Sequence, residues 1–212
     1  MKQAYIFIGR SGCGKGTQVD LLIEQLKKQG ESIFNLETGS KFREFIKGSG
    51  YSNKLAKEVG EKGGLQPEFL AVFMWAKAIT DNLKEGDTIV LDGVARKILE
   101  AKLLNTVFEF LGYKKPVVVF INVSRQWSEE RLLGRGRNDD AVQGIKKRLD
   151  WYDTDVEPVI EWYRNNSDYN FLDINGEQTI EEVYREIMEK IKTSNNLQNI
   201  RSNPKNNLSQ PE

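Results

Sequence analysis

The segment GRSGCGKGT, residues 9–17, constrains the fold of this 212-residue chain more than any other feature. It follows the apolar run YIFI and precedes a segment in which apolar residues from Val19 to Leu26 recur at helical spacing before Gly30. A glycine turn between a strand and a helix directs backbone N–H groups and the helix N-terminus toward an anion. The match to G-x-x-x-x-G-K in this context predicts a phosphate-binding loop rather than an ordinary glycine-rich turn.

Four further apolar runs, SIFNL, TIVLDG, PVVVFINV and YNFLDING, alternate with long segments that have helical spacing. This alternation predicts an α/β fold with a central five-stranded parallel sheet flanked by helices. The near-continuous apolar runs YIFI, TIVL and VVVFI are typical of central strands, whereas SIFNL and NFLDI are expected nearer the edges. The region over residues 38–78, with glycines and Pro67 between short helical patterns, is expected to be a helical insertion into this core.

The composition excludes several classes of function. Lys plus Arg and Asp plus Glu each number 31, so no net basic field favours a nucleic acid or an anionic membrane as a partner. No apolar stretch approaches about 18 residues and the N-terminus lacks a signal peptide's features, so we expect a cytoplasmic protein. With no histidine and one cysteine, Cys13, the sequence offers neither a structural zinc site nor Ser-His or Cys-His catalysis.

Charged side chains are spaced in a way that suits phosphate chemistry. Asp92 ends a buried-looking strand, and a carboxylate there, beside a phosphate loop, is where Mg²⁺ is held; the alternative is an acidic residue that starts a turn. Fork-shaped guanidiniums suit phosphate oxygens, although any one arginine is also typical of a solvated surface. The arginines in question are Arg43, Arg96, Arg135, Arg137 and Arg148.

These motifs, in this order, resemble the nucleoside-monophosphate kinases and, within them, the adenylate kinases, over about residues 3–191. GKGTQ is similar to their ATP-phosphate loop, with Gly16 between Lys15 and Thr17. TGSKFREF resembles TGD-x-x-R, GGLQPE resembles G-x-L-V-P-D/E, LDGVAR takes the place of LDGFPR, and RLLGR, RNDD and DINGEQ match later segments. The resemblance implies a P-loop kinase that transfers the γ-phosphoryl group of Mg·ATP reversibly to AMP, giving two ADP, without zinc.

The resemblance also implies a role for each matching residue. For ATP, these are Gly12, Cys13, Gly14, Lys15, Gly16, Thr17, Arg131, Arg135 and Gln178. For AMP, they are Thr38, Gly39, Arg43, Gly64, Leu65, Gln66, Gly93, Val94, Ala95, Arg96, Glu100, Arg137 and Arg148. Those expected to act on the transferred group are Lys15, Arg96, Arg135, Arg137 and Arg148, and Asp92 is expected to hold Mg²⁺ through water.

The first departure from the family pattern concerns the lid. Only Gly136 separates Arg135 from Arg137, where family members carry a loop or small subdomain, so exclusion of water from the site is in question. A milder departure affects both nucleotide pockets and the segments beside them. There Ser11, Ser40, Val94 and Ala95 replace the usual proline, aspartate, phenylalanine and proline.

A further departure concerns the choice of base. Glu100 occupies the position where adenylate kinases place a glutamine against the adenine of AMP. An ionised glutamate only accepts hydrogen bonds, which suits the two adjacent donors of guanine, or the amino group of cytosine. The alternative for Glu100 is a pairing with Arg96, one helical turn earlier.

The expected organisation is one kinase domain over residues 1–192, followed by a polar, Asn-rich and disordered tail over residues 193–212. The resemblance implies a monomer, and the alternative is an oligomer in which a neighbouring subunit substitutes for the lid. Two other functions stay open: a kinase for CMP, UMP or GMP, and a nucleotide-responsive binding protein with little catalysis. The expected parts are a core of residues 1–37, 79–133 and 141–192, a monophosphate-binding insertion of residues 38–78, and a vestigial lid of residues 134–140.

Overall fold

The computed structural model describes residues 2–135 and 142–202 of the chain. Five parallel strands form one sheet in the order β2-β3-β1-β4-β5, which confirms the predicted fold class. The runs predicted to be central form β1, β3 and β4, and the two runs expected nearer the edges form the edge strands β2 and β5. The strands are β1 (Ala4–Gly9), β2 (Ile33–Glu37), β3 (Thr88–Asp92), β4 (Val117–Asn122) and β5 (Asn170–Asn175).

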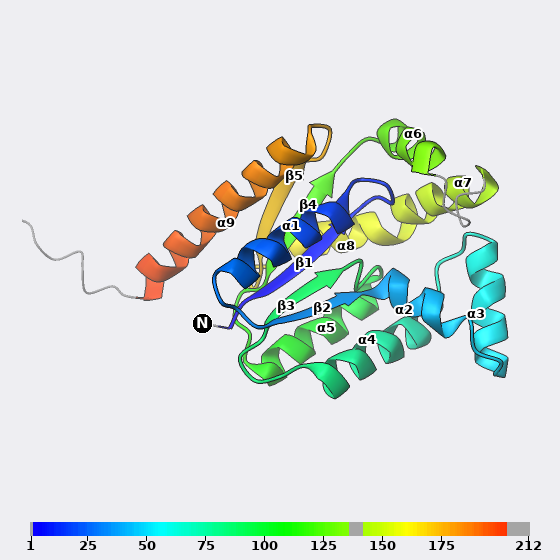
Figure 1. Cartoon of the computed structure of the whole chain (residues 1–212), viewed down its shortest axis with the longest axis horizontal. Helices are drawn as coiled ribbons and strands as arrows, with labels where there is room; N and C mark the ends of the chain where they lie inside the picture. Colours follow the sequence, from blue (N-terminus) through cyan, green and yellow to red (C-terminus); the bar gives the residue numbers. More distant parts are fainter. Residues whose placement is uncertain (1, 136–141, 203–212) are drawn as a thin grey trace, which may run out of the picture.

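Helices cover both faces of this sheet (Figure 1). Helices α1 and α9 pack on one face, and α4, α5 and α8 pack on the other. A π-helical segment, η1 (Tyr152–Val156), joins α7 to α8. The helices are α1 (Lys15–Lys28), α2 (Thr38–Phe45), α3 (Tyr51–Glu61), α4 (Glu68–Asn82), α5 (Ile98–Leu111), α6 (Arg125–Arg135), α7 (Val142–Trp151), α8 (Glu157–Arg164) and α9 (Ile180–Ser202).

Strand β1 lies at the centre of the sheet and contributes side chains to the apolar layers on both of its faces. Ile6 and Ile8 point into the layer with α4, α5 and α8, whereas Tyr5 and Phe7 point toward α1 and α9. Successive side chains of a strand point to opposite faces, so a strand covered on both sides needs apolar residues at every position. Burial of each such side chain contributes about 1.5–3 kcal/mol to the free energy of folding.

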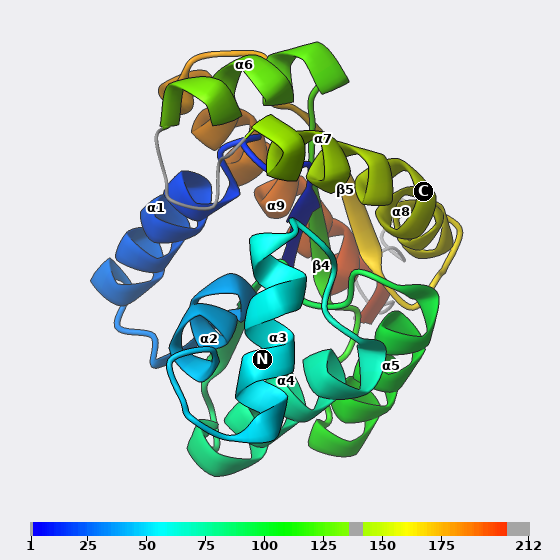
Figure 2. The same cartoon turned by 90° about the vertical axis from the view of Figure 1, so that its right-hand side faces the viewer.

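The remaining helices lie at the carboxyl end of the sheet. Figure 2 looks at this end and shows α6 and α7 on one side and α2 and α3 on the other. In open α/β sheets, ligands bind outside the carboxyl ends of the strands. The fold therefore places the phosphate loop, which follows β1, between two groups of helices.

The predicted boundaries differ from the structure in two places. Helix α4 continues past residue 78, the expected end of the insertion, to Asn82. Helix α9 continues through residues 193–202, which were predicted to belong to a disordered tail. The correction has a simple cause: each residue added to an existing helix gains one hydrogen bond, so a helix extends into a polar segment that would not start one. Residues 136–140 of the predicted lid and 203–212 of the predicted tail lie outside the described residues.

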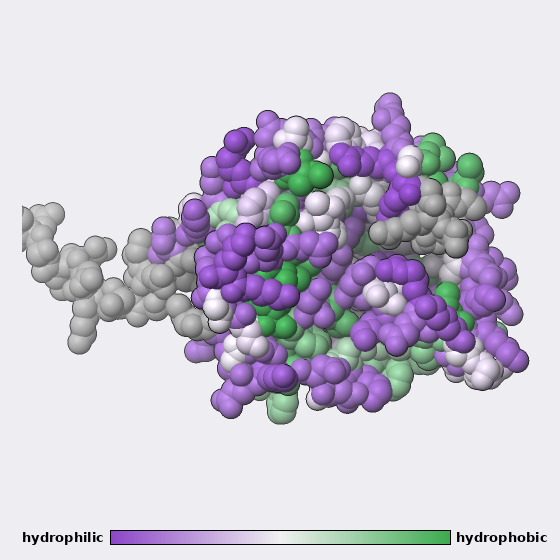
Figure 3. Space-filling model, viewed as in Figure 1, coloured by the Kyte–Doolittle hydropathy of each residue, from purple (hydrophilic) through white to green (hydrophobic). Residues whose placement is uncertain are grey.

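The surface of the described chain is mostly hydrophilic on the face that carries α1 and α9, with small hydrophobic patches (Figure 3). This distribution is typical of a surface in contact with water. Among the helices in the described ranges, none is both long enough and apolar enough to cross a membrane.

Candidate active site

The phosphate loop has the backbone that the glycine pattern predicts. Gly12 and Gly14 have φ values of 87° and 93°, a region that glycine adopts at little cost. Gly9 has no room for a side chain, because a Cβ there would lie 2.5 Å from the carbonyl oxygen of Ile121. Gly14 is the N-cap of α1, so the N–H groups at the start of this helix face the loop.

Lys15, the first residue of α1, folds back over the loop. Its Nζ donates hydrogen bonds to the carbonyl oxygens of Gly9 and Arg10, both at 2.9 Å, and contacts Cys13 Sγ at 3.6 Å. The side chain of Cys13 is buried. The lysine charge is held at the loop, and within the described residues it forms no ion pair with an acidic side chain, so it is available to a phosphate.

Asp92 ends β3 directly beside the loop. The strand register places it next to Phe7 of β1, and a Cβ on Gly16 would lie 3.9 Å from Asp92 Oδ2. Burial raises the pKa of this carboxyl, and the charges of Lys15 and Arg96 oppose that rise. Within the described residues, no hydrogen bond or ion pair engages the carboxylate. An oxygen donor that is half-buried, close to the loop and otherwise unengaged fits a water-mediated Mg²⁺ site, because Mg²⁺ needs only one or two carboxylates besides substrate phosphates.

Arg96 lies within electrostatic reach of both Asp92 and Arg148, which come from different elements. Arg96 Nε donates to the carbonyl oxygen of Gly93 at 3.0 Å, and its guanidinium lies over the ring of Trp151. Burial lowers the pKa of Arg96, Asp92 raises it, and the nearby charge of Arg148 lowers it further. Two arginines within electrostatic reach of each other make a region where a phosphate replaces an unfavourable like-charge contact with favourable ones.

The turn between β3 and α5 holds Arg96 in a constrained backbone. Gly93 has φ of 66°, and Ala95 has φ of 57°, which is uncommon for a residue with a side chain. Val94 and Ala95 are buried in the core, at 1% and 0% exposure, so the residues that replace phenylalanine and proline are packing groups in this structure. Strained backbone of this kind clusters at ligand-binding sites.

The acceptor side of the predicted site is less complete. Thr38, at the start of α2, has a buried hydroxyl without a hydrogen-bond partner in the described residues, and the same holds for Gln66 Oε1. Arg43 is half-exposed and donates to Glu37 Oε1 at 2.8 Å, and Gly39 lies against this pair. Gly64 and Leu65 lie with Gln66 in the connection between α3 and α4. At a buried polar atom without a partner, a ligand or a water molecule can complete the hydrogen bonding.

Glu100 is buried at 3% exposure near the start of α5. Its Oε2 accepts a hydrogen bond from the backbone N–H of Arg96 at 3.2 Å, so the contact with Arg96 is made through the main chain. Burial raises the pKa of this carboxyl to about 7 and nearby Glu68 adds to the rise, whereas Arg96 and Lys97 act against it. A carboxyl with this pKa changes charge near neutral pH.

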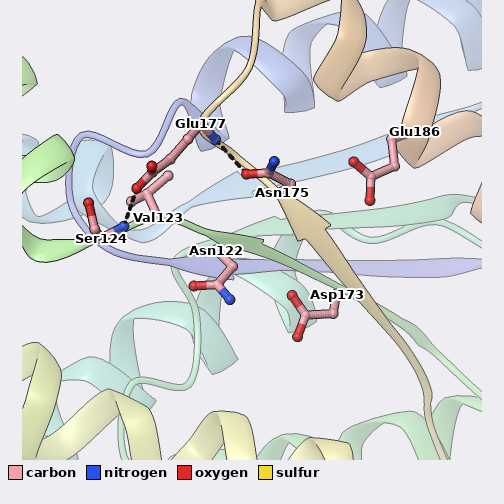
Figure 4. Close-up of a pocket in the computed structure, with 7 residues that line it drawn as sticks. All are labelled: Asn122, Val123, Ser124, Asp173, Asn175, Glu177 and Glu186. Atoms are coloured by element: carbon pink, nitrogen blue, oxygen red, sulfur yellow. Dashed lines mark hydrogen bonds between the residues drawn. The ribbon is translucent and has the colours of Figure 1, made fainter.

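The residues predicted for the ATP base lie along α6 and after β5. Arg131 is exposed and its guanidinium lies over the ring of Trp127. Gln178 donates to the carbonyl oxygen of Asn175 at 2.8 Å and to Glu186 Oε2 at 2.9 Å. Figure 4 shows the adjoining pocket, in which Glu177 accepts a hydrogen bond from the Ser124 N–H and donates its own N–H to Asn175. The carboxylates that line this pocket repel phosphate groups, so the phosphates of ATP are expected at the loop and not here.

The structure therefore brings together Lys15, Asp92, Arg96 and Arg148, and it connects Arg43 to them through Glu37, whose register partner is Asp92. Arg135 is the exposed last residue of α6. Arg137 lies outside the described residues.

Sequence reasoning missed two features of this region. Trp151 Nε1 donates to the carbonyl oxygen of Gly63 at 3.1 Å, and a Cβ on Gly63 would lie 2.7 Å from the Cα of Gly144. The insertion therefore touches α7 directly. The other feature is Arg10, a loop residue whose guanidinium binds Asp153 and Glu157. Neither contact has a local signal, because its partners are separated by about 80 to 150 residues in sequence.

The arrangement suits a reaction that needs charge neutralisation and alignment. Backbone N–H groups, a lysine and arginines surround the carboxyl end of β1 and β3, and no histidine is available as a base. Phosphoryl transfer depends mainly on positioning and electrostatic stabilisation, so this set of groups is sufficient for it. In the described part of the chain, no group of three or more acidic, cysteine or histidine side chains forms a metal cage.

Comparison with known proteins gives one consistent result. The family model described as adenylate kinase matches residues 7–168. An adenylate kinase of Parabacteroides distasonis is 33% identical over 190 residues, which cover 88% of this chain and 96% of that protein. An adenylate kinase of Prochlorococcus marinus is 32% identical over 84% of this chain and 93% of that protein, and adenylate kinase 1 of a Nostoc species is 32% identical over 86% and 95%.

Proposed function

The chain belongs to the adenylate kinase family, whose reaction is ATP plus AMP to two ADP, and from this premise we propose which residues carry each part of that transfer. The observation that carries the proposal is the convergence of Lys15, Asp92 and Arg96 at the carboxyl ends of neighbouring strands. The β and γ phosphates of ATP bind the loop from Gly12 to Thr17. AMP binds between the insertion and α7.

The donor side works through the loop and Lys15. When ATP binds, Lys15 Nζ exchanges the carbonyl oxygens of Gly9 and Arg10 for phosphate oxygens. The N–H groups of the loop donate to the same phosphates, and the helix N-terminus adds a favourable potential. Asp92, with its unengaged carboxylate, holds Mg²⁺ through water. Bound there, Mg²⁺ would neutralise charge on the phosphate oxygens.

The acceptor side works through arginines. Arg43 exchanges Glu37 for the AMP phosphate, and Arg96 binds the same phosphate from the β3–α5 turn. Arg148, with Arg137, bridges both substrates and stabilises the charge of the moving phosphoryl group. An arginine in that role accelerates transfer by about 10³- to 10⁵-fold. The contact of Gly63 with Gly144 holds the insertion against α7 and so keeps these groups on the two sides of one site.

Recognition of the base rests on Thr38 and Glu100. The pKa of Glu100, about 7, keeps a large fraction of the carboxyl neutral near pH 7. A neutral carboxyl donates one hydrogen bond and accepts another, as a glutamine amide does, and this pair matches the edge of adenine. AMP is therefore the acceptor that this proposal favours over GMP or CMP.

The experiment that tests this assignment is a comparison of acceptors. Purified protein is supplied with Mg·ATP and with AMP, GMP, CMP or UMP in turn, and the diphosphate products are counted. The expected result is fast turnover with AMP and at least about 100-fold slower turnover with the other three, since a mismatched base leaves buried polar groups unpaired. Preference for GMP would mean that Glu100 is ionised in the complex and that the base assignment is wrong.

The proposal extends to the setting of the reaction. The monomer is taken as the working unit, with a cytoplasmic location and no nucleic acid or membrane partner. With a short lid, the exclusion of water depends on the contact between the insertion and α7 and on ordered substrates. A neighbouring subunit in place of the lid is the alternative, and the dependence of turnover on protein concentration separates the two.

A further inference from the structure

Asp153 joins three elements around the phosphate loop. One oxygen of its carboxylate accepts a hydrogen bond from Arg10 Nη1, and the other accepts from Arg125 Nη1 at 2.7 Å. Arg10 lies in the phosphate loop, Arg125 begins α6, and Asp153 lies in η1. Both carboxylate oxygens are therefore engaged by cations from other parts of the chain.

Arg10 connects Lys15 to this carboxylate. Its backbone carbonyl oxygen accepts hydrogen bonds from Lys15 Nζ at 2.9 Å and from the N–H of Cys13 at 3.2 Å. Its side chain is 12% exposed, and the guanidinium lies 4.1 Å from the centre of the Tyr152 ring. An arginine stacked on an aromatic face and paired with a carboxylate has a fixed direction. The loop position is thus tied to η1.

Arg125 extends the same connection to α6. Its Nη2 donates to Asp150 Oδ1 at 2.5 Å, close to the end of α7, while Nη1 donates to Asp153. The first residue of α6 is therefore fastened near the last residues of α7. Helix α6 carries Arg131 and Arg135, and α7 carries Arg148.

The π-helical turn is where these contacts are made. Segments of π-helix inside α-helices are rare, and those that occur are often found at functional sites. Here the segment lies directly after α7 and presents Asp153 to two arginines at once. The ion pairs themselves are only partly buried, with side-chain exposures of 37% for Asp153 and 38% for Arg125. The Arg125–Asp153 pair is exposed enough to add little stability, whereas the pair with Arg10, whose side chain is 12% exposed, is better shielded from water; both pairs fix the direction of the Asp153 carboxylate.

We propose that Asp153 is a positioning residue for phosphoryl transfer, which holds the phosphate loop, α6 and α7 in the geometry that aligns Lys15 with Arg148. The inference rests on the proposed function and concerns how the phosphate loop, α6 and α7 are held in their relative positions. The start of α6 and the end of α7 are thereby fixed to the phosphate loop by charged side chains. Displacement of reacting groups by about 1 Å reduces rates by about 100-fold, so loss of the carboxylate acts on kcat more than on folding.

The test compares Asp153→Asn with wild-type protein in steady-state kinetics with Mg·ATP and AMP. The expected result is a fall in kcat of about 10- to 100-fold. The KM for AMP is expected to change by less than about 3-fold, because none of the three paired groups, Arg10, Arg125 and Asp153, is itself assigned to the AMP site. The thermal midpoint is expected to change by less than about 4 °C. Asp150→Asn, which leaves both contacts of Asp153 intact, is expected to lower kcat by less than about 3-fold.

Two further variants make the result decisive. In Arg10→Gln the connection between Asp153 and the loop is already cut, so adding Asp153→Asn to it is expected to lower kcat by less than Asp153→Asn does in the wild-type protein. Asp81→Asn removes an exposed ion pair with Lys77 at the far end of α4 and serves as the matched control. Unchanged kcat in Asp153→Asn together with a lower thermal midpoint would show a structural role only and overturn the inference. If Asp153→Asn does not fold, Arg10→Gln alone decides, since wild-type kcat in that variant also overturns it. Lack of AMP kinase activity in the wild-type protein would instead contradict the proposed function.

Discussion

The donor side and the acceptor side of this site differ in how complete they are without substrates. On the donor side, the loop glycines, Lys15 and Asp92 are in place, and the loop is tied to η1 through Arg10 and Asp153. On the acceptor side, Thr38 and Gln66 have buried polar atoms without partners in the described residues.

This difference teaches where binding energy is used in such an enzyme. A preformed phosphate loop binds its ligand without reorganisation, so the full interaction energy of the loop with the phosphates can stabilise the transition state. A half-formed acceptor pocket gains its remaining hydrogen bonds only when the acceptor arrives, and closure then depends on the correct acceptor. We therefore expect donor-side changes to reduce kcat and acceptor-side changes to act mainly on the KM for AMP.

The largest effect is expected from Lys15→Ala. Loss of a charge that stabilises the transferred group lowers kcat by about 1,000-fold, and the fold is retained because the amine contacts polar groups of the loop and not the core. The measurement is the rate of ADP formation, with circular dichroism as the check on folding. Lys28→Ala at the other end of α1, where the lysine pairs with Glu24 on the surface, is the matched control. Near-normal turnover in Lys15→Ala would contradict the assignment of the loop.

The next effect is expected from Asp92→Asn. The amide keeps the shape and loses the charge that attracts Mg²⁺, so we expect kcat to fall by about 100-fold and the Mg²⁺ concentration for half-maximal rate to rise by about 10-fold. A Mg²⁺ titration of the rate measures both. A lower kcat with an unchanged Mg²⁺ requirement would mean that Asp92 positions Arg96 or Lys15 and does not hold the metal.

Glu100 sharpens the comparison on the acceptor side. Since its pKa is raised to about 7, the carboxyl is mostly neutral at pH 6 and mostly ionised at pH 8. If the neutral form binds adenine, the KM for AMP in the wild-type protein rises by about 10-fold from pH 6 to pH 8, as the neutral fraction falls from about nine-tenths to about one-tenth. Glu100→Gln is expected to remove this rise, and Glu109→Gln, at an exposed site on the same helix, to keep it. A KM for AMP that does not depend on pH in the wild-type protein would exclude Glu100 from base recognition.

The same raised pKa has a consequence for stability. The folded protein binds the Glu100 proton more tightly than the unfolded chain does. The contribution of Glu100 to the free energy of unfolding therefore falls as pH rises from about 4.5 to about 7, and it is constant above that. Glu100→Gln therefore also removes a destabilising contribution at pH 8.

The smallest effect is expected from Trp151→Phe. This change removes the hydrogen bond to the carbonyl oxygen of Gly63 but keeps an aromatic ring under Arg96. A neutral hydrogen bond contributes about 0.5–1.5 kcal/mol, so the KM for AMP is expected to rise by about 3-fold with little change in kcat. Trp162→Phe, in an aromatic cluster with Tyr163 and Tyr169, is the control. A larger loss in kcat than in KM would show that the contact between the insertion and α7 also positions the transferred group.

Much of the fold was readable from the sequence, for physical reasons. A strand covered on both faces must be apolar throughout, so β1, β3 and β4 stood out, and the glycines of the loop have the positive φ values that only glycine adopts freely. Local patterns were less informative for the end of α9, because the extension of an existing helix depends on the residues before it.

The candidate site was partly readable for the same reasons. Residues that follow strands in a parallel sheet meet at one end, which brings Lys15, Asp92 and Arg96 together without any knowledge of side-chain packing. The bond between Arg10 and Asp153 joins residues 143 positions apart, and the raised pKa of Glu100 comes from burial by several elements. Such contacts have no local sequence signal, since they depend on how helices pack.

The most direct test of the central claim is the stoichiometry of the wild-type reaction. ATP labelled in its γ-phosphate is mixed with Mg²⁺ and AMP, and ADP and inorganic phosphate are counted as ATP is consumed. The account predicts two ADP for each ATP, label in the ADP formed from AMP, and little free phosphate. One ADP and one phosphate for each ATP, regardless of AMP, would mean that water receives the phosphoryl group and would contradict the account.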